Sequence, residues 1–173
     1  MTEQTWVINA SPLILLGKIN QLELVKRLAS CLIVPQSVLD ELAAGTQDHS
    51  TQSTLNWAQC HAQPDIAVPV SILHWDIGVG ESQVLAQCLC IQGSKAVLDD
   101  AKARAAAQSH QISLIGTLGI ILRAKQSGIT AAARPLIEQL LANGSYLSES
   151  LIREALRKVG PIPGTDQFRG QYT

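Results

Sequence analysis

Short apolar runs alternate with amphipathic stretches along most of the chain. The apolar runs are three or four residues long and rich in aliphatic side chains, which is typical of buried strands. Between them, apolar residues recur at three- and four-residue spacings, which indicates helices. Such alternation predicts an α/β fold, a parallel sheet with helices on both faces. The strands are expected at residues 5–8, 32–34, 96–98 and 113–115.

Helices are predicted between and after these strands. Ser11 followed by Pro12 marks a helix start, because serine accepts from free backbone N–H groups and proline lacks a donor that would be unpaired there. The last two helices follow one another without an intervening strand, so we expect a C-terminal helical pair that serves dimer or partner contacts. The predicted helices span residues 12–19, 21–29, 35–44, 80–92, 100–108, 117–126, 131–143 and 148–158.

The length and composition predict one cytoplasmic domain. The 173 residues accommodate a single core over residues 1–159, followed by a flexible tail at 160–173 that opens with Gly-Pro-Ile-Pro-Gly. The chain has neither a membrane-spanning run nor a signal-peptide pattern. A hydrophobic fraction of 46% favours an apolar patch that a partner covers. The net charge of −1 argues against coating nucleic acid by bulk electrostatics, but allows an enzyme that holds one strand locally.

Zinc and disulfide chemistry are not expected. The four cysteines lie in apolar surroundings without paired ligand spacing, so we interpret them as buried thiols. The four histidines are scattered, and none is part of a His-Glu-x-x-His motif.

Polar residues follow two of the predicted strands. Asn9 comes directly after residues 5–8, and Asp99 and Asp100 come after residues 96–98. Because strand ends of an open parallel sheet meet in one crevice, these side chains are expected to converge. One aspartate there is an ordinary helix cap, whereas two exceed what capping needs. The alternative role of Asn9 is to orient the turn into the first helix.

Two glutamates are expected on inward helix edges. Glu41 shares a helix edge with Val38 and Leu42, where an unpaired carboxylate would be costly, so a basic group or a metal should meet it. Glu81 follows Gly80 at the mouth of the next helix, where the helix dipole favours a carboxylate. The alternatives are a structural ion pair or an exposed helix edge for Glu41, and a simple first-turn role for Glu81.

Convergence of three or four carboxylates predicts a divalent-metal site. At about 6 Å each pair would repel by about 2–3 kcal/mol with an effective dielectric near 20. Mg²⁺ or Mn²⁺ prefers oxygen ligands and also binds substrate phosphates, so phosphodiester hydrolysis is the natural chemistry. The expected metal ligands are Asn9, Glu41, Glu81, Asp99 and Asp100, and the four acids are also the expected catalytic residues.

Three further residues are expected to contact the substrate. Thr117 lies in Gly116-Thr117-Leu118-Gly119, a helix start that either seats a phosphate or packs a tight turn. Arg104 follows the aspartates and is expected to contact substrate phosphates, whereas Lys102 is expected to be solvated. Ser11 is the third of these residues, at the start of the first helix.

As an ordered set, these motifs resemble the PIN domain of VapC-type toxins. The resemblance covers about residues 6–130. It implies a three-layer α/β/α sandwich and a Mg²⁺- or Mn²⁺-dependent ribonuclease, often a homodimer and the toxin of a toxin–antitoxin pair. Its acidic site would fall on Asn9, Glu41, Glu81 and Asp99 or Asp100. The family most often has aspartate where this chain has Asn9, which predicts a raised metal demand. The matching segments are 7–14, Val34-Pro35 with Val38 and Glu41, Gly80-Glu81, 98–100 with Ala103-Arg104, and 116–119 followed by Ala124-Lys125 and Gly128.

Two other functions remain open from the sequence. A PIN-like protein whose site lacks one charge could bind RNA or a protein partner without hydrolysis. Alternatively, Asp99 or Asp100 could be the phosphoacceptor of a receiver-like domain. That function requires an acidic pair after the first strand, where this chain has Asn9-Ala10.

Overall fold

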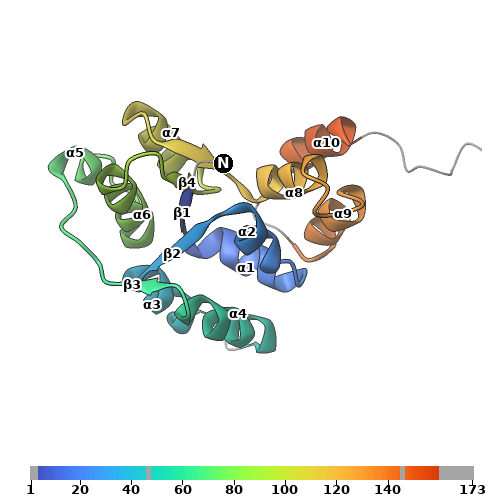
Figure 1. The fold of residues 1–173 in the computed structure, drawn as a ribbon, viewed down its shortest axis with the longest axis horizontal. Helices are drawn as coiled ribbons and strands as arrows, with labels where there is room; N and C mark the ends of the chain where they lie inside the picture. Colours follow the sequence, from blue (N-terminus) through green and yellow to red (C-terminus); the bar gives the residue numbers. More distant parts are fainter. Residues whose placement is uncertain (1–3, 46–47, 145–146, 160–173) are drawn as a thin grey trace, which may run out of the picture.

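The computed structural model describes residues 4–45, 48–144 and 147–159. Its centre is a five-stranded sheet in the order β3-β2-β1-β4-β5, in which every neighbouring pair is parallel. Helices flank this sheet, which gives the predicted α/β/α sandwich (Figure 1). The strands are β1 (Thr5–Ile8), β2 (Cys31–Pro35), β3 (Ala62–Gln63), β4 (Lys95–Val97) and β5 (Ser113–Ile115).

The helices pack against one another around the sheet. Helix α1 packs against α3, α4 and α8, α6 packs against α3, α5 and α7, and α2 packs against α8 (Figure 1). Helices α9 and α10 contact each other and α8, which confirms the predicted C-terminal pair. The helices are α1 (Ala10–Lys18), α2 (Glu23–Leu28), α3 (Gln36–Ala44), α4 (His49–Gln59), α5 (Val70–Leu73), α6 (Val79–Cys90), α7 (Ala101–Ser109), α8 (Thr117–Gln126), α9 (Arg134–Ala142) and α10 (Glu149–Lys158).

The core lies on the central strands. Trp6, Val7 and Ile8 of β1 are fully buried, as are Ala96 and Val97 of β4. A strand that is buried on both faces reads as a continuous apolar run, which is why the sequence shows these strands clearly. This rigid centre fixes the two strand ends that carry the candidate site.

The structure corrects several sequence predictions. Helices α4 and α5 and strand β3 were not predicted. Helix α4 buries Thr51, Thr54 and Ala58 rather than large aliphatic residues, so its helical period is hard to see in a hydrophobicity pattern. Strand β3 is a two-residue edge strand with both residues exposed. Helix α1 begins at Ala10, earlier than predicted, because Pro12 still falls within the first turn, where its missing N–H costs no hydrogen bond.

The prediction of four buried thiols is wrong. Only Cys88 is buried, and burial raises the pKa of its thiol to about 11. Cys31, Cys60 and Cys90 lie at the ends of elements, where their side chains are exposed. The expected tail at 160–173 lies outside the described residues. In the described part of the chain, no helix is long and apolar enough to cross a membrane.

Candidate active site

The two predicted strand ends lie side by side. Ile8 of β1 pairs with Val97 of β4, and the Asn9 N–H donates to the Val97 carbonyl at 3.1 Å. Asn9 and Asp99 therefore leave neighbouring strands at the same edge of the sheet. This arrangement places the candidate site where the strand order changes direction, the usual ligand crevice of an open parallel sheet.

Asn9 is a buried amide with one unsatisfied atom. Its side chain donates from Nδ2 to Glu81 Oε1 at 3.1 Å, and only 2% of the residue is exposed. Its Oδ1 atom is buried and has no hydrogen-bond partner among the described residues. A buried acceptor without a partner costs about 1–3 kcal/mol, so this oxygen is a candidate position for a bound group.

The carboxyl group of Glu41, on α3, lies beside Gly80 and Asn9. Its Oε1 accepts from the Gly80 N–H at 3.0 Å. A Cβ at Gly80 would lie 2.7 Å from Glu41 Oε1 and 3.0 Å from Asn9 Oδ1, so only glycine leaves room for both oxygens. Burial of the carboxyl group raises the pKa of Glu41, the Gly80 hydrogen bond opposes this, and the nearby charge of Glu81 adds to it. Gly80 was not predicted as a site residue; its position directly before Glu81 was the available signal.

We call Asn9, Glu41 and Glu81 the Asn9 cluster. Glu81 lies in the first turn of α6, half-buried, and reaches Asn9 through Oε1. The cluster brings together one amide oxygen from the turn between β1 and α1 and two carboxylates from α3 and α6. These are hard oxygen donors, and Mg²⁺ is commonly held by one or two carboxylates together with waters and substrate phosphates. The residues present therefore fit a divalent cation of that class.

Asp99 is held apart from this cluster by Thr117. The Thr117 N–H donates to Oδ1 at 2.8 Å, and its hydroxyl donates to Oδ2 at 2.6 Å. Burial raises the pKa of Asp99, whereas the two Thr117 bonds and the positive charge of Arg104 lower it. Thr117 itself is fully buried. We therefore assign Thr117 the positioning of Asp99, in place of the predicted contact with substrate.

Asp100 acts as a helix cap. Its Oδ2 accepts from the Ala103 N–H at 2.9 Å at the start of α7, and the residue is exposed. The expected convergence of all four carboxylates is thus not observed. No group of three or more His, Cys, Asp and Glu side chains in the described ranges is arranged to hold a metal. The reason is local, because Asp99 turns toward α8 and Asp100 toward α7.

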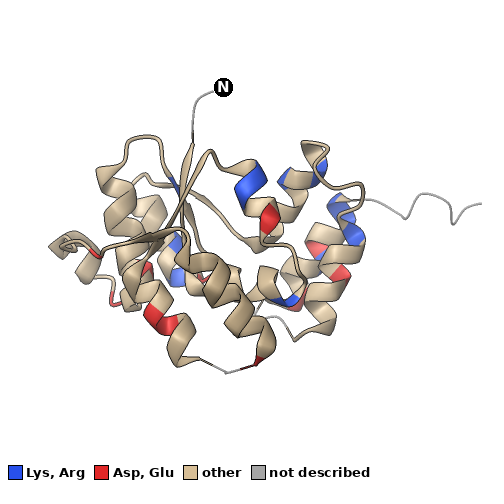
Figure 2. Cartoon of the chain, turned by 60° about the horizontal axis from the view of Figure 1, so that its bottom comes forward, with Lys and Arg blue, Asp and Glu red and all other residues tan. Residues whose placement is uncertain are grey.

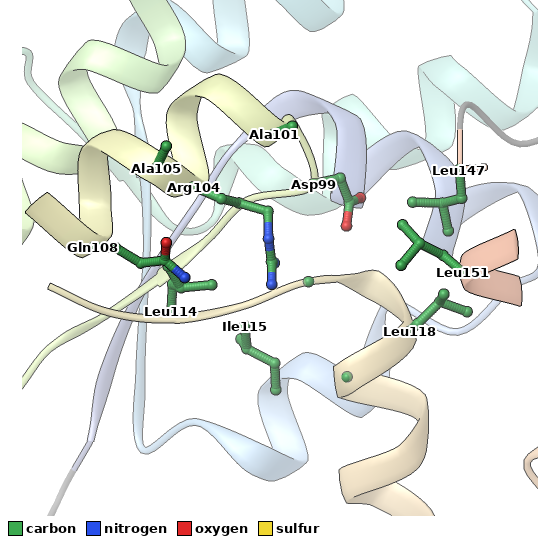
Figure 3. A pocket seen from close by; sticks show the side chains of 12 residues that line it. Asp99, Ala101, Arg104, Ala105, Gln108, Leu114, Ile115, Leu118, Leu147 and Leu151 are labelled. Atoms are coloured by element: carbon green, nitrogen blue, oxygen red, sulfur yellow. The ribbon is translucent and has the colours of Figure 1, made fainter. Parts of the chain in front are cut away.

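A pocket of about 560 Å³ opens beside Asp99 (Figure 3). Arg104 extends into it and donates from Nη1 to the Leu98 carbonyl at 2.9 Å. A neighbouring pocket is bordered by Ser11 and Asp99. Arg104 and Ser11 therefore lie where a strand of substrate could reach them, while Lys102 is exposed and bonds to the Asp76 carbonyl. The apolar lining of the larger pocket includes Leu114, Ile115, Leu118, Leu147 and Leu151.

Thr117→Val is expected to change the pH dependence of stability through Asp99. A carboxyl whose pKa is raised by folding is favoured in its neutral form, so the free energy of unfolding falls as pH rises from the ordinary Asp pKa to the raised one. Removing the Thr117 hydroxyl raises the Asp99 pKa further and extends that fall to higher pH. Urea unfolding from pH 3 to pH 8 in EDTA measures it. An unchanged pH profile would contradict the role given to Thr117.

Comparison with known proteins identifies the family. A family model described as "PIN domain" matches residues 5–161. Among solved structures, VapBC2 from Rickettsia felis bound to a DNA fragment from its promoter is similar, with 12% identity, a TM-score of 0.43, and coverage of 65% of this chain and 98% of that chain. No curated protein matches. The match spans nearly all of the described residues, and the chain belongs to the PIN-domain family.

Proposed function

We propose that this protein is a divalent-metal-dependent ribonuclease that cleaves phosphodiester bonds of single-stranded RNA, with Mg²⁺ or Mn²⁺ as cofactor. PIN domains are generally nucleases, which supports hydrolase activity for this chain. The observation that carries the proposal is the unsatisfied Asn9 Oδ1, buried beside two carboxylates at the crevice of the sheet. A bound cation would satisfy that oxygen and offset the repulsion between Glu41 and Glu81.

The chain's own residues divide into three roles. Asn9, Glu41 and Glu81 would hold the cation, which when bound supplies positive charge to phosphate oxygens and makes water more acidic. Asp99 is an acidic residue of the crevice outside the Asn9 cluster, and Thr117 fixes the orientation of its carboxylate. Arg104, half-buried beside Asp99, would bind a phosphate of the entering strand. Asp100 has no part in this proposal beyond capping α7.

The biological role proposed is the toxin of a toxin–antitoxin pair, acting as a homodimer. Both parts rest on the family resemblance rather than on a contact in this chain. The apolar pocket beside Asp99 is the kind of surface that an antitoxin segment could cover.

The direct test is cleavage of a single-stranded RNA by the purified full chain. We expect products with Mn²⁺ or Mg²⁺, none in EDTA, and none from DNA of the same sequence. Cleavage that persists in EDTA, or equal cleavage of DNA, would contradict the proposal.

A second function is favoured by Asn9. The Asn9 amide donates a hydrogen bond to Glu81, whereas a carboxylate at this position would repel Glu81. The site therefore carries less negative charge than a site of four acids and needs no metal ion to be stable. Such a site could bind RNA or a protein partner without cutting it. Metal-independent RNA binding with no cleavage at any Mn²⁺ concentration would favour this function.

A further inference from the structure

The described charges are divided between two sides of the molecule. Helices α2, α8, α9 and α10 carry eight of the 13 lysines and arginines but only four acidic residues. Figure 2 shows most of the blue on the side that these helices form, with some red among it and more red on the opposite side. The basic residues are Lys26, Arg27, Arg123, Lys125, Arg134, Arg153, Arg157 and Lys158. The overall charge of −1 conceals this asymmetry.

The four helices of this basic side meet at α8, and a pocket lies between α9 and α10. Arg27 donates from Nη1 to the Ile129 carbonyl, which ties the end of α2 to the loop between α8 and α9. Arg134 of α9 and Arg153 and Arg157 of α10 line one pocket of about 540 Å³. Three guanidinium groups around a single hollow are a strong local concentration of positive charge.

The acidic residues nearby neutralise this pocket only in part. Arg134 pairs with Glu138 at 3.7 Å, and Arg153 pairs with Glu149 at 3.5 Å. Both pairs are between neighbouring helical turns and partly or largely exposed, so each contributes at most about 1 kcal/mol and opens easily to another anion. Arg157 has no acidic partner within the described ranges. Among the described residues, the three arginines around the pocket outnumber the two glutamates that pair with them, so an external anion can still bind there.

The basic pocket is separate from the candidate active site. Leu151, near the start of α10, borders the pocket beside Asp99. Arg153 and Arg157 lie about 200° and 240° around the helix from Leu151, at 3.6 residues per turn. The buried residues Ile152 and Ala155 lie between these two sides of the helix. The two pockets therefore border different faces of α10.

We propose that this basic side, centred on Arg134, Arg153 and Arg157, is a second binding surface for the phosphate backbone of RNA. Arginine suits this partner because its planar guanidinium binds phosphate oxygens in pairs. The surface would hold a long RNA while one segment of it occupies the crevice. That the bound anion is RNA rests on the proposed function. The binding of RNA to this surface, however, does not require that the protein cleaves it.

The test compares Arg153→Gln/Arg157→Gln with a variant of equal charge change, Gln52→Glu/Gln59→Glu on exposed positions of α4. Binding of a long single-stranded RNA to the full chain is measured in EDTA over a salt series. We expect the arginine variant to bind more weakly and its salt slope to fall by about 1.4, or about 0.7 for each lost phosphate contact. The α4 variant should keep the wild-type salt slope.

Two further measurements separate this proposal from its alternatives. Where the wild type cleaves, the arginine variant should cleave a dinucleotide at the wild-type rate and long RNA with a raised KM. If wild-type binding and salt slope persist in the arginine variant, the proposal is overturned. It is also overturned if the variant loses binding to polyglutamate but not to RNA, because the surface would then fit an acidic protein. Binding that depends on the arginines in a protein that never cleaves would refute the nuclease function alone.

Discussion

Glu41→Gln is expected to lower metal-dependent RNA cleavage by more than about 100-fold, because even residues that only orient metal ligands contribute about 10- to 100-fold. Glutamine retains an oxygen that can accept from the Gly80 N–H, so the local structure should persist. What it removes is one of the two negative charges of the Asn9 cluster. The cleavage rate is measured at saturating RNA over a Mn²⁺ series.

Stability measurements distinguish this effect from misfolding. In EDTA, Glu41→Gln removes a carboxyl whose pKa is raised by burial and by Glu81, so the metal-free protein should be at least as stable as the wild type near pH 7. The stabilisation that Mn²⁺ gives to the wild type should shrink in the variant, since binding to the folded state stabilises it by RT ln(1 + [L]/Kd) and the variant's Kd is larger.

Asp40→Asn is the matched control for Glu41→Gln. Asp40 is the adjacent residue on α3, is exposed, and accepts a hydrogen bond from Gln36 rather than from the Asn9 cluster. The control removes the same charge from the same helix and should leave cleavage unchanged. Equal losses in the two variants would show a general charge effect and refute a specific role for Glu41.

Helical spacing predicted an inward edge for Glu41 from Val38 and Leu42, and the structure corrects this. Glu41 is exposed, although its Oε1 accepts from the Gly80 N–H beside Asn9. The expected partner was a basic group or a metal. A backbone N–H donor from a helix start that lies 39 residues further along the chain could not be read from local periodicity.

The strand ends could be predicted from the sequence, whereas the directions of the side chains that follow them could not. Apolar runs locate β1 and β4, and parallel pairing then brings Asn9 and Asp99 to one edge. Whether Asp99 faces Asn9 or Thr117 depends on where β5 ends and α8 begins. The Thr117 hydroxyl and N–H decide that question with two hydrogen bonds. Polar helices such as α4 were missed because threonine and alanine fill their buried face.

Asn9→Asp is expected to destabilise the metal-free protein while strengthening metal binding. The Asn9 amide now donates to Glu81 at 3.1 Å, and an aspartate there would set two carboxylates against each other in a buried place. One of them must then hold a proton, so the pKa of the pair rises. A raised pKa in the folded state means that unfolding free energy is lost as pH climbs from about 4 toward that raised value.

The expected destabilisation of Asn9→Asp is large enough to be measured by thermal unfolding. A lost buried hydrogen bond and an unpaired charge cost about 1–3 kcal/mol, and for a chain of this size each kcal/mol lowers Tm by about 2–4 °C. We therefore expect a Tm several degrees below wild type in EDTA near pH 7. Saturating Mn²⁺ should raise the Tm of Asn9→Asp by more than it raises that of the wild type, because the added anion is a better ligand than an amide oxygen.

Cleavage over a metal series then decides what Asn9 does in the wild type. If Asn9 is a weak ligand in an active nuclease, Asn9→Asp should reach half-maximal cleavage at a lower Mn²⁺ and Mg²⁺ concentration. If cleavage appears only in Asn9→Asp, the wild type is a binding protein that lacks one charge. Asn56→Asp, an exposed position on α4, is the control for the substitution itself. Unchanged cleavage and unchanged metal stabilisation in Asn9→Asp would remove Asn9 from the metal site, because no metal ligand can change its charge without altering affinity.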